Sequence, residues 1–367
     1  MLDDIRQTKH AQLILDHSLE VKKHQLLLIR GSEETIPLIR EIYRLALERE
    51  VRPFIQMSFD GQTKTFFDVV SDEELQFVSP IEEYIATKID ASVLIYGGGN
   101  TRDTKNVDLD KRVKHARSQK NLIDIATRRV LEGRLRRIIT VHPTHSEAQE
   151  AGMSLESYTD YLYRCIKLDR EDPIAEWRRI GVEQDRIIEK LKKCETLSFS
   201  SPGIGLKLNT KGRTWMNCSG LRNLPDGEIF TSPLENSVEG EIYFHFGTIR
   251  EGHLVKGVKL VFREGIVVEA SAEAGEEFLI SQLGLDEGSR RVGEIAFGTN
   301  SDVSQLVGRI LIDEKFGHAI HLALGRSLPG TNGVNDSVLH WDFIADMSDG
   351  VVRADGELIY EQGRFLI

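Results

Sequence analysis

The chain has 367 residues and a formal net charge of −11 at pH 7, with 40% hydrophobic and 29% charged residues. This length favours two domains over a single core, and the composition is typical of a soluble globular protein. The negative charge argues against binding along a phosphate backbone, so no nucleic-acid partner is expected. No apolar run approaches the roughly eighteen residues of a membrane span, so no membrane partner is expected either.

Three cysteines, Cys165, Cys194 and Cys218, have no C-x-x-C spacing, and an odd number cannot all pair. The N-terminal residues lack the basic-then-apolar pattern of a secretory signal. Together these features predict a reduced protein, and we expect it in the cytoplasm.

The first half of the chain alternates short apolar segments with amphipathic ones. Strand, helix and strand in close succession make a βαβ unit, which implies parallel pairing with a right-handed crossover. We therefore predict a mostly parallel α/β domain over residues 1 to about 190. In chain order the predicted elements are helix 5–19, strand 24–30, helix 33–50, strand 51–58, helix 72–87, strand 91–96, helices within 109–134, strand 137–142, and helices 154–169 and 173–194.

After Cys194 the pattern changes to alternating segments separated by glycine turns. Glu264-Gly265 has the sequence of a tight hairpin turn between two such segments. Residues 195–367 therefore predict a second, β-rich α+β domain with mixed or antiparallel sheet. The elements expected here are strands 196–200, 205–208, 255–263, 266–272 and 339–344, and a helix at 275–283.

Candidate metal ligands occur near the C-terminus. If residues 339–344 form a strand, His340 and Asp342 are two positions apart and project from the same face. An apolar segment before them carries His321. A histidine in such a segment also occurs as a hydrogen-bonded core residue, and an H-x-D pair as a structural hydrogen bond. The sequence pattern here leaves both interpretations open.

Two carboxylates of the second domain stand among apolar neighbours. Glu228 lies in a short predicted strand between two turns, and Glu294 is the single charge in the segment V-G-E-I-A-F-G. A buried carboxylate must be paired, metal-bound or protonated, because burying it bare is costly. Each is individually also consistent with a partly exposed strand residue. With His321, His340 and Asp342 they supply five nitrogen and oxygen ligands in one domain.

Several segments resemble one known family. N-L-P-D-G-E-I-F-T-S-P, R-V-G-E-I-A-F-G-T-N, I-H-L-A-L-G and H-W-D-F-I occur in this order, and H-P-T-H-S-E-A-Q-E-A-G-M-S-L-E-S-Y lies upstream. Together they resemble the thermophilic metallo-aminopeptidases of the aminopeptidase T type, from about His142 to the C-terminus. The resemblance implies that Glu228, Glu294, His321, His340 and Asp342 are the metal ligands.

The implied function is hydrolytic removal of N-terminal residues from peptides. Five ligands, three of them carboxylates, suit two divalent ions (Zn, Co or Mn) roughly 3.5–4 Å apart with a bridging carboxylate. Such a pair activates water, polarises a peptide carbonyl and binds a free α-amino group. The expected partners are peptide substrates, and the resemblance also implies a homodimer.

One position departs from the family. The family's tyrosine, which is expected to stabilise the tetrahedral intermediate, corresponds to Leu328. Loss of one such donor typically costs about 10²–10³ in rate unless another group replaces it. Arg326 and Ser327 are the nearest polar side chains, although the favoured interpretation of Arg326 is a solvated loop residue.

Two other functions fit parts of the pattern. His321, His340 and Asp342 alone make the two-histidine, one-carboxylate set of non-haem iron oxygenases, and ring-cleaving dihydroxypyridine dioxygenases resemble this peptidase family. Glu228 and Glu294 argue against that alternative, because an iron triad needs no further acids. A catalytically silent metal-binding protein on the same scaffold is the third possibility.

Overall fold

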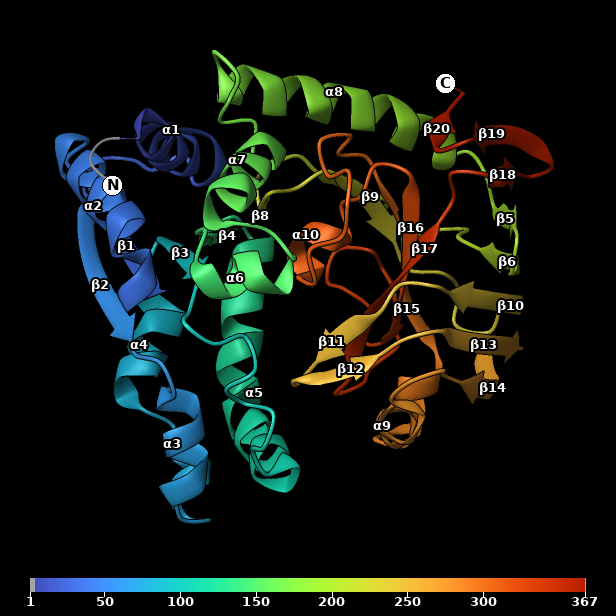
Figure 1. Cartoon of the computed structure of the whole chain (residues 1–367), viewed down its shortest axis with the longest axis horizontal. Coiled ribbons are helices and arrows are strands. Elements are labelled where there is room, and N and C mark those ends of the chain that lie inside the picture. Colours follow the sequence, from blue (N-terminus) through green and yellow to red (C-terminus); the bar gives the residue numbers. More distant parts are fainter. Residues whose placement is uncertain (1–3, 367) are drawn as a thin grey trace. The chain divides into compact units, whose positions relative to one another are not determined.

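The computed structural model describes residues 4–366. The chain forms two compact units (Figure 1). Unit 1 contains the residues up to Glu176 together with Gly220–Pro225, and unit 2 contains Trp177–Ser219 and the chain from Asp226 onward. The boundary expected at residues 190–195 lies at the C-terminal end of helix α8 (Pro173–Leu191), whereas the unit boundary lies near its beginning.

Unit 1 is built on a five-stranded parallel sheet, as the βαβ pattern predicts. Parallel pairing joins all neighbouring strands. Leu27, Leu28 and Ile29 of the first strand are fully buried, as expected for a strand covered on both faces. The strand order is β2 (Arg52–Ser58), β1 (Leu26–Ser32), β3 (Ala91–Tyr96), β4 (Arg136–Val141) and β8 (Asn223–Leu224).

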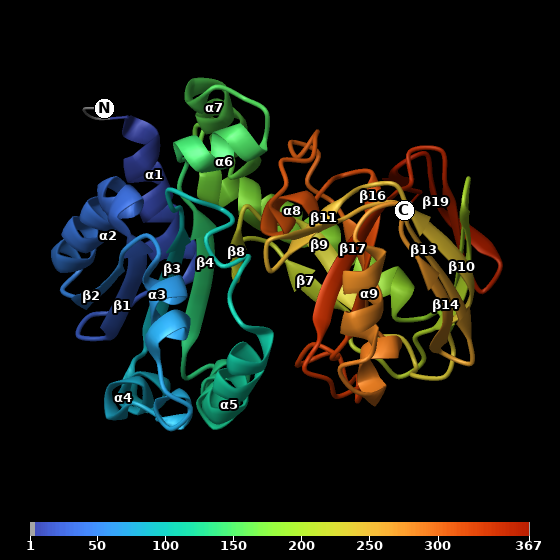
Figure 2. The ribbon, with the colours of Figure 1, turned by 60° about the horizontal axis from the view of Figure 1, so that its bottom comes forward.

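Helices cover this sheet on both faces (Figure 2). Leu28 packs with Ile85 of α4 on one face, whereas Gly31, with the opposite parity, lies close to Ile39 of α2. The helix predicted at 72–87 is shorter, because Ser79 caps it and Pro80 begins it. The helices are α1 (Ile5–Leu13), α2 (Ile36–Glu48), α3 (Gln62–Val69), α4 (Pro80–Lys88), α5 (Leu109–Leu131), α6 (His145–Glu150) and α7 (Leu155–Cys165).

Unit 2 contains antiparallel sheets, which confirms the β-rich fold predicted for this part of the chain. The eight-stranded sheet has the order β14 (Ile266–Ser271), β13 (Val258–Arg263), β10 (Glu239–Phe244), β6 (Ile204–Asn209), β5 (Thr196–Ser201), β18 (Val351–Ala354), β19 (Glu357–Glu361), β20 (Arg364–Phe365). The five-stranded sheet has the order β17 (His340–Asp346), β16 (Ala319–Gly325), β15 (Val292–Gly298), β9 (Glu228–Thr231), β7 (Met216–Cys218).

Smaller elements complete unit 2. The strand predicted at 255–263 is divided into β12 (His253–Val255), which pairs with β11 (Thr248–Arg250), and β13. The break falls at Gly257, whose φ of 63° no regular strand tolerates. Glu264 and Gly265 both have positive φ, as the predicted hairpin turn requires. The helices of this unit, among the described residues, are α8 from Trp177 onward, α9 (Glu276–Leu283) and α10 (Ile310–Asp313).

The main hydrophobic core of unit 2 contains side chains of its two large sheets. Phe199, Ile242 and Leu260 come from the eight-stranded sheet, and Phe297 and Phe343 from the five-stranded sheet. The ring centroids of Phe244 and Phe343 are 5.3 Å apart, and those of Phe199 and Phe297 are 5.8 Å apart. Among the described residues no helix is long and apolar enough to span a membrane.

Candidate metal centre

The five predicted ligands lie on one face of the antiparallel five-stranded sheet of unit 2. In each strand, the residues that enter the core alternate with the candidate ligands: Ile229 follows Glu228, Ile320 and Leu322 flank His321, and Trp341 separates His340 from Asp342. Because alternate strand residues point to opposite faces, the core fixes the orientation of the ligands. We call Glu228, Glu294, His321, His340 and Asp342 the ligand cluster.

Glu294 depends on an irregularity of β15. The register against β16 shifts between Val292 and Glu294, which allows Val292 to join the core while Glu294 points to the opposite face. Bulges of this kind re-aim side chains next to functional sites. Glu294 and Asp342 both pair with Ala323 of β16, so a small residue separates the two carboxylates and leaves space above the sheet.

The two oxygens of Glu294 face different histidines. Its Oε1 lies 3.4 Å from His321 Nε2, and its Oε2 lies 3.4 Å from His340 Nε2. At one end of the cluster, His321 Nε2 is 3.3 Å from Glu228 Oε2. At the other end, His340 Nε2 is 3.8 Å from Asp342 Oδ1. Glu294 therefore stands between two groups of ligand atoms.

The second nitrogen of each histidine contacts a backbone carbonyl. His321 Nδ1 lies 3.1 Å from the carbonyl oxygen of Glu314, and His340 Nδ1 lies 2.9 Å from that of Arg326. A carbonyl oxygen only accepts, so Nδ1 must carry the hydrogen and donate it. In the neutral imidazoles Nε2 is then left with its lone pair facing the carboxylates, as in a metal ligand.

The ligand atoms have the spacing that a bound ion requires. Nitrogen and oxygen ligands lie roughly 2.0–2.2 Å from zinc, so two ligands in tetrahedral arrangement lie roughly 3.3–3.6 Å apart. The separations of 3.3 and 3.4 Å around His321 and Glu294 match that range. Groups with ligand atoms within 4.8 Å of one another include Glu228–Glu294–His321 and Glu294–His340–Asp342.

Without metal, the cluster changes the protonation of its histidines. Burial lowers the pKa of His321, but the hydrogen bond with Glu294 and the charges of Glu228 and Glu294 outweigh it and raise the pKa to about 9. Burial also lowers the pKa of His340, but Asp342 and Glu294 outweigh this effect and raise the pKa to about 10. Burial raises the pKa of Glu294, yet both histidines lower it to about 2.

Glu314 is a further candidate ligand that the sequence did not reveal. It forms a further group with His321 and Asp342, with ligand atoms within 4.8 Å of one another. Its side chain is 13% exposed. It immediately follows the short helix α10 in the charged tripeptide Asp313-Glu314-Lys315, which resembles a solvated turn. Only the proximity of α10 to the sheet brings Glu314 to the cluster.

A buried lysine adjoins the same end of the cluster. Lys315 Nζ lies 2.6 Å from Glu228 Oε1, 2.7 Å from Glu314 Oε1 and 3.7 Å from Asp226 Oδ1. Lys315 and Asp226 are fully buried. The charged network therefore extends beyond the predicted ligands, and an ammonium group is part of it.

Solvent reaches the cluster from one end. The side chains of His340 and Asp342 are 22% and 14% exposed, whereas those of His321 and Glu294 are 1% and 3% exposed. Among the five candidate ligands, His340 and Asp342 are therefore more accessible to solvent than His321 and Glu294.

Leu328 lies on the ligand face of the five-stranded sheet. It packs against a small hydrophobic group formed by Cys218, Phe230 and Ala296. Ala296 pairs directly with His321 of the ligand cluster. The side chain of Arg326 is exposed. Ser327 is buried, and its hydroxyl makes no hydrogen bond with any described residue. The position of the family tyrosine is therefore beside the ligand cluster. Neither Arg326 nor Ser327 is seen to replace the tyrosine hydroxyl.

A large apolar cavity of the described chain does not belong to the ligand cluster. It has a volume of about 860 Å³ and lies within unit 1, lined mainly by apolar residues of α3, α4 and α5. None of its lining residues belongs to a group of possible metal ligands. The chemistry of the cluster in unit 2, rather than cavity size, therefore identifies the candidate centre.

Comparison with known proteins gives a consistent result. The sequence model of the thermophilic metalloprotease (M29) family matches residues 3–365. Aminopeptidase 2 of Geobacillus stearothermophilus is 27% identical over 405 residues, and the match covers 97% of each chain. Aminopeptidase T of Thermus thermophilus is 30% identical over 251 residues, covering 60% of each chain.

A solved structure has the same fold. Wild-type AmpT from Thermus thermophilus superposes with a TM-score of 0.84 at 22% identity, covering 99% of both chains. The iron dioxygenase alternative finds no support among these relatives. Because the family model spans nearly the whole sequence, the chain belongs to the thermophilic metalloprotease (M29) family and is a metal-dependent peptidase.

Proposed function

We propose that this protein is an aminopeptidase whose ligand cluster holds two divalent metal ions. The observation that carries the proposal is the position of Glu294, whose two oxygens face Nε2 of two different histidines at 3.4 Å each. A bridging carboxylate in this position is typical of dinuclear hydrolases. One ion would take Glu228, His321 and Glu294, and the other Glu294, His340 and Asp342, with Glu314 as an additional ligand.

Charge balance supports the same ion count. Contacts of 3.8 Å or less connect the ligand cluster with Lys315, Glu314 and Asp226. When ionised, the five carboxylates of this network carry five negative charges, Lys315 supplies one positive charge, and two divalent ions supply four. With neutral histidines and neutral water on the ions the sum is zero, and a largely buried network favours such a balance.

The chain's own residues would prepare the reaction. Two bound divalent ions supply a hydroxide at neutral pH and polarise the scissile carbonyl. The backbone carbonyls of Glu314 and Arg326 hold the two imidazoles with Nε2 facing the centre. The exposed end at His340 and Asp342 is where the α-amino group of a peptide would enter. An ion held at that end would bind the lone pair of the neutral α-amino group, which suits cleavage at N-termini.

Metal analysis combined with a substrate panel tests this proposal. We expect two ions per chain with Zn²⁺, Co²⁺ or Mn²⁺, loss of activity on chelation, and recovery when the metal is returned. An aminoacyl anilide should be hydrolysed, whereas its N-acetylated analogue should not, because the free amine is blocked. Cleavage of the blocked substrate at a similar rate would contradict an aminopeptidase, and a single ion at saturation would contradict the dinuclear centre.

We also propose peptides as substrates, a homodimer and a cytoplasmic location. Membership of a peptidase family supports the substrate class. The resemblance to the aminopeptidase T type motivates the dimer, and the three free cysteines agree with a reducing compartment. Sedimentation velocity of the metal-loaded protein would test the dimer, with a monomer at all concentrations as the contradicting result.

A further inference from the structure

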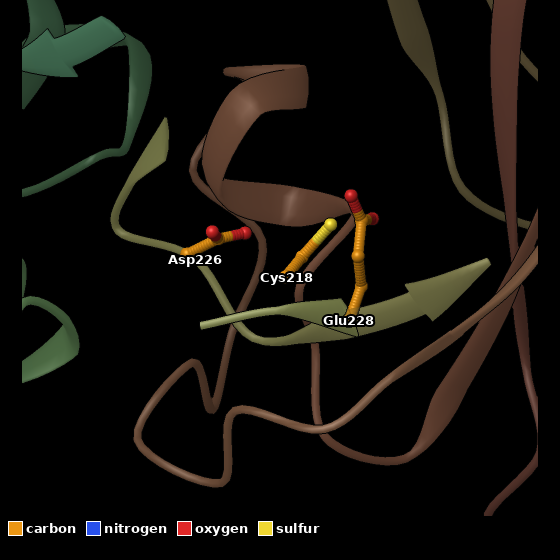
Figure 3. A group of neighbouring side chains, drawn as sticks. All are labelled: Cys218, Asp226 and Glu228. Atoms are coloured by element: carbon orange, nitrogen blue, oxygen red, sulfur yellow. The ribbon is translucent and has the colours of Figure 1, made fainter. Parts of the chain in front are cut away.

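A third group of possible metal ligands lies next to the ligand cluster. This group contains Cys218 of β7, Asp226 just before β9, and Glu228 at the start of β9. One ligand atom of each residue lies within 4.8 Å of those of the other two, and all three residues are buried. Figure 3 shows the thiol and the two carboxylates converging on the same side of the strands. A soft thiolate with two carboxylates would suit a divalent ion such as Zn²⁺ or Co²⁺.

The ammonium of Lys315 lies against this third group. Its Nζ is 2.6 Å from Glu228 Oε1 and 3.7 Å from Asp226 Oδ1. Glu314 Oε1 is 2.7 Å away on another side. Lys315 is fully buried, so it reaches neither bulk solvent nor a substrate. A buried ammonium is tolerated only where carboxylates compensate it, and three of them do so here.

We infer that Lys315 is a resident cation that occupies this third position and thereby limits the centre to two metal ions. A metal ion coordinated by Asp226 and Glu228 would lie only a few ångströms from the ammonium, and the two positive charges would repel each other strongly in a buried site. Unlike a metal ion, the ammonium is covalently attached and does not dissociate. The inference rests on the proposed dinuclear centre for the count in the wild type.

Lys315 also positions Glu228. Because Glu228 Oε1 faces the ammonium, only Oε2 is directed at His321 Nε2, at 3.3 Å. Glu228 is therefore held as a ligand through one oxygen. Lys315 is a positioning residue, since it contacts ligands and not the reacting atoms.

Cobalt loading of Lys315→Ala tests the inference. Removing the side chain opens space beside Cys218, Asp226 and Glu228, so we expect one more Co²⁺ per chain than in the wild type. Coordination by Cys218 deprotonates the thiol, and a thiolate-to-cobalt charge-transfer band should appear in the near ultraviolet. The double variant Lys315→Ala with Cys218→Ser should lose that band. Lys259→Ala, which removes an exposed lysine paired with Glu241, should behave as the wild type.

The wild type provides a second measurement that does not depend on the variant folding. At saturating Co²⁺ it should show no thiolate band, because Lys315 keeps the third position closed. A thiolate band in the wild type would overturn the inference, as would a folded Lys315→Ala protein with an unchanged ion count and no band. A wild type with one ion instead of two would refute the dinuclear proposal alone, because the inference concerns the increment between variant and wild type.

Discussion

At the scale of single residues, the centre combines acids that attract cations with groups that hold them in place. Glu294 contacts both histidines, and each histidine is fixed through Nδ1 by a backbone carbonyl. Positioning groups of this kind typically change metal affinity about 10–100-fold when removed. The contribution of a residue to the centre is therefore best measured by metal content rather than by stability.

Removal of a ligand should reduce metal content. We expect Glu228→Ala, His321→Ala and Asp342→Ala each to bind fewer ions than the wild type, by elemental analysis after dialysis. Their melting temperatures should respond less to added metal, because binding to the folded state stabilises it by mass action. His318→Ala is the matched control, since His318 lies three positions before His321 but contacts Gly363 instead of the cluster. Unchanged metal content in all three ligand variants would refute the assignment.

Position 328 should respond to restoration of the phenol. Leu328 packs on Phe230 and Ala296, beside the ligand cluster, so Leu328→Tyr brings a hydroxyl to the ligand face. We expect faster turnover of an aminoacyl anilide, by at most the roughly 10²–10³-fold that one oxyanion donor contributes. Leu328→Phe is the control, because it adds the ring without the hydroxyl. Equal rates for both variants would show that the phenol adds no transition-state donor here.

At the scale of elements, four adjacent strands supply the predicted ligands, and their burial is unequal. His321 and Glu228 are nearly inaccessible, whereas His340 and Asp342 at the end of the sheet order are partly exposed. A chelator reaches exposed ligands without opening the fold, but buried ligands exchange only when the structure opens locally. The two ion positions should therefore differ in their exchange kinetics.

Chelation should remove the ions in two kinetic phases. We expect the ion bound by His340 and Asp342 to leave first and the ion bound by Glu228 and His321 to leave more slowly, as followed by cobalt absorbance during treatment with excess chelator. Asp342→Asn should accelerate the fast phase and leave the slow phase near its wild-type rate. A single phase for both ions, or an effect of Asp342→Asn on the slow phase alone, would contradict this order.

At the scale of the whole molecule, the centre couples folding to pH. In the metal-free protein the pKa values of His321 and His340 are raised from 6.5 to about 9 and about 10. Raised pKa values stabilise the fold below pH 6.5, and this contribution is lost as the pH rises through 9 to 10. The lowered pKa of Glu294 acts oppositely, stabilising above pH 4.5 and losing its contribution as the pH falls toward 2.

Metal should therefore stabilise the protein more at high pH than at low pH. Binding through Nε2 requires neutral imidazoles, so protons compete with the ions until the pH exceeds the raised pKa values of the histidines. We expect the rise in melting temperature on adding Zn²⁺ to increase from pH 6 to pH 9. Calorimetry with and without chelator measures it, and other titrating groups largely cancel in the difference. A metal-induced rise that decreases over this range would contradict the prediction.

The sequence by itself determined the fold class and, through the family motifs, five candidate ligands. Alternation of apolar and polar residues in strand β17 (His340–Asp346) indicates which face is buried, so the sequence pattern alone placed His340 and Asp342 on one face. It did not determine the boundary of the first unit, because Gly220–Pro225 returns to the parallel sheet through a contact that no local pattern encodes.

Only the tertiary structure decided what surrounds the ligands. Glu314 and Lys315 follow a four-residue helix, and their charges read locally as a solvent-exposed turn. Their burial arises from packing of that turn against strands that are distant in the sequence, where Lys315 meets Asp226 and Glu228. Electrostatic pairing depends on distance in space, whereas sequence patterns report only the periodicity of each element. The network of Lys315, Glu314 and Asp226 next to the ligand cluster was therefore revealed only by the tertiary structure.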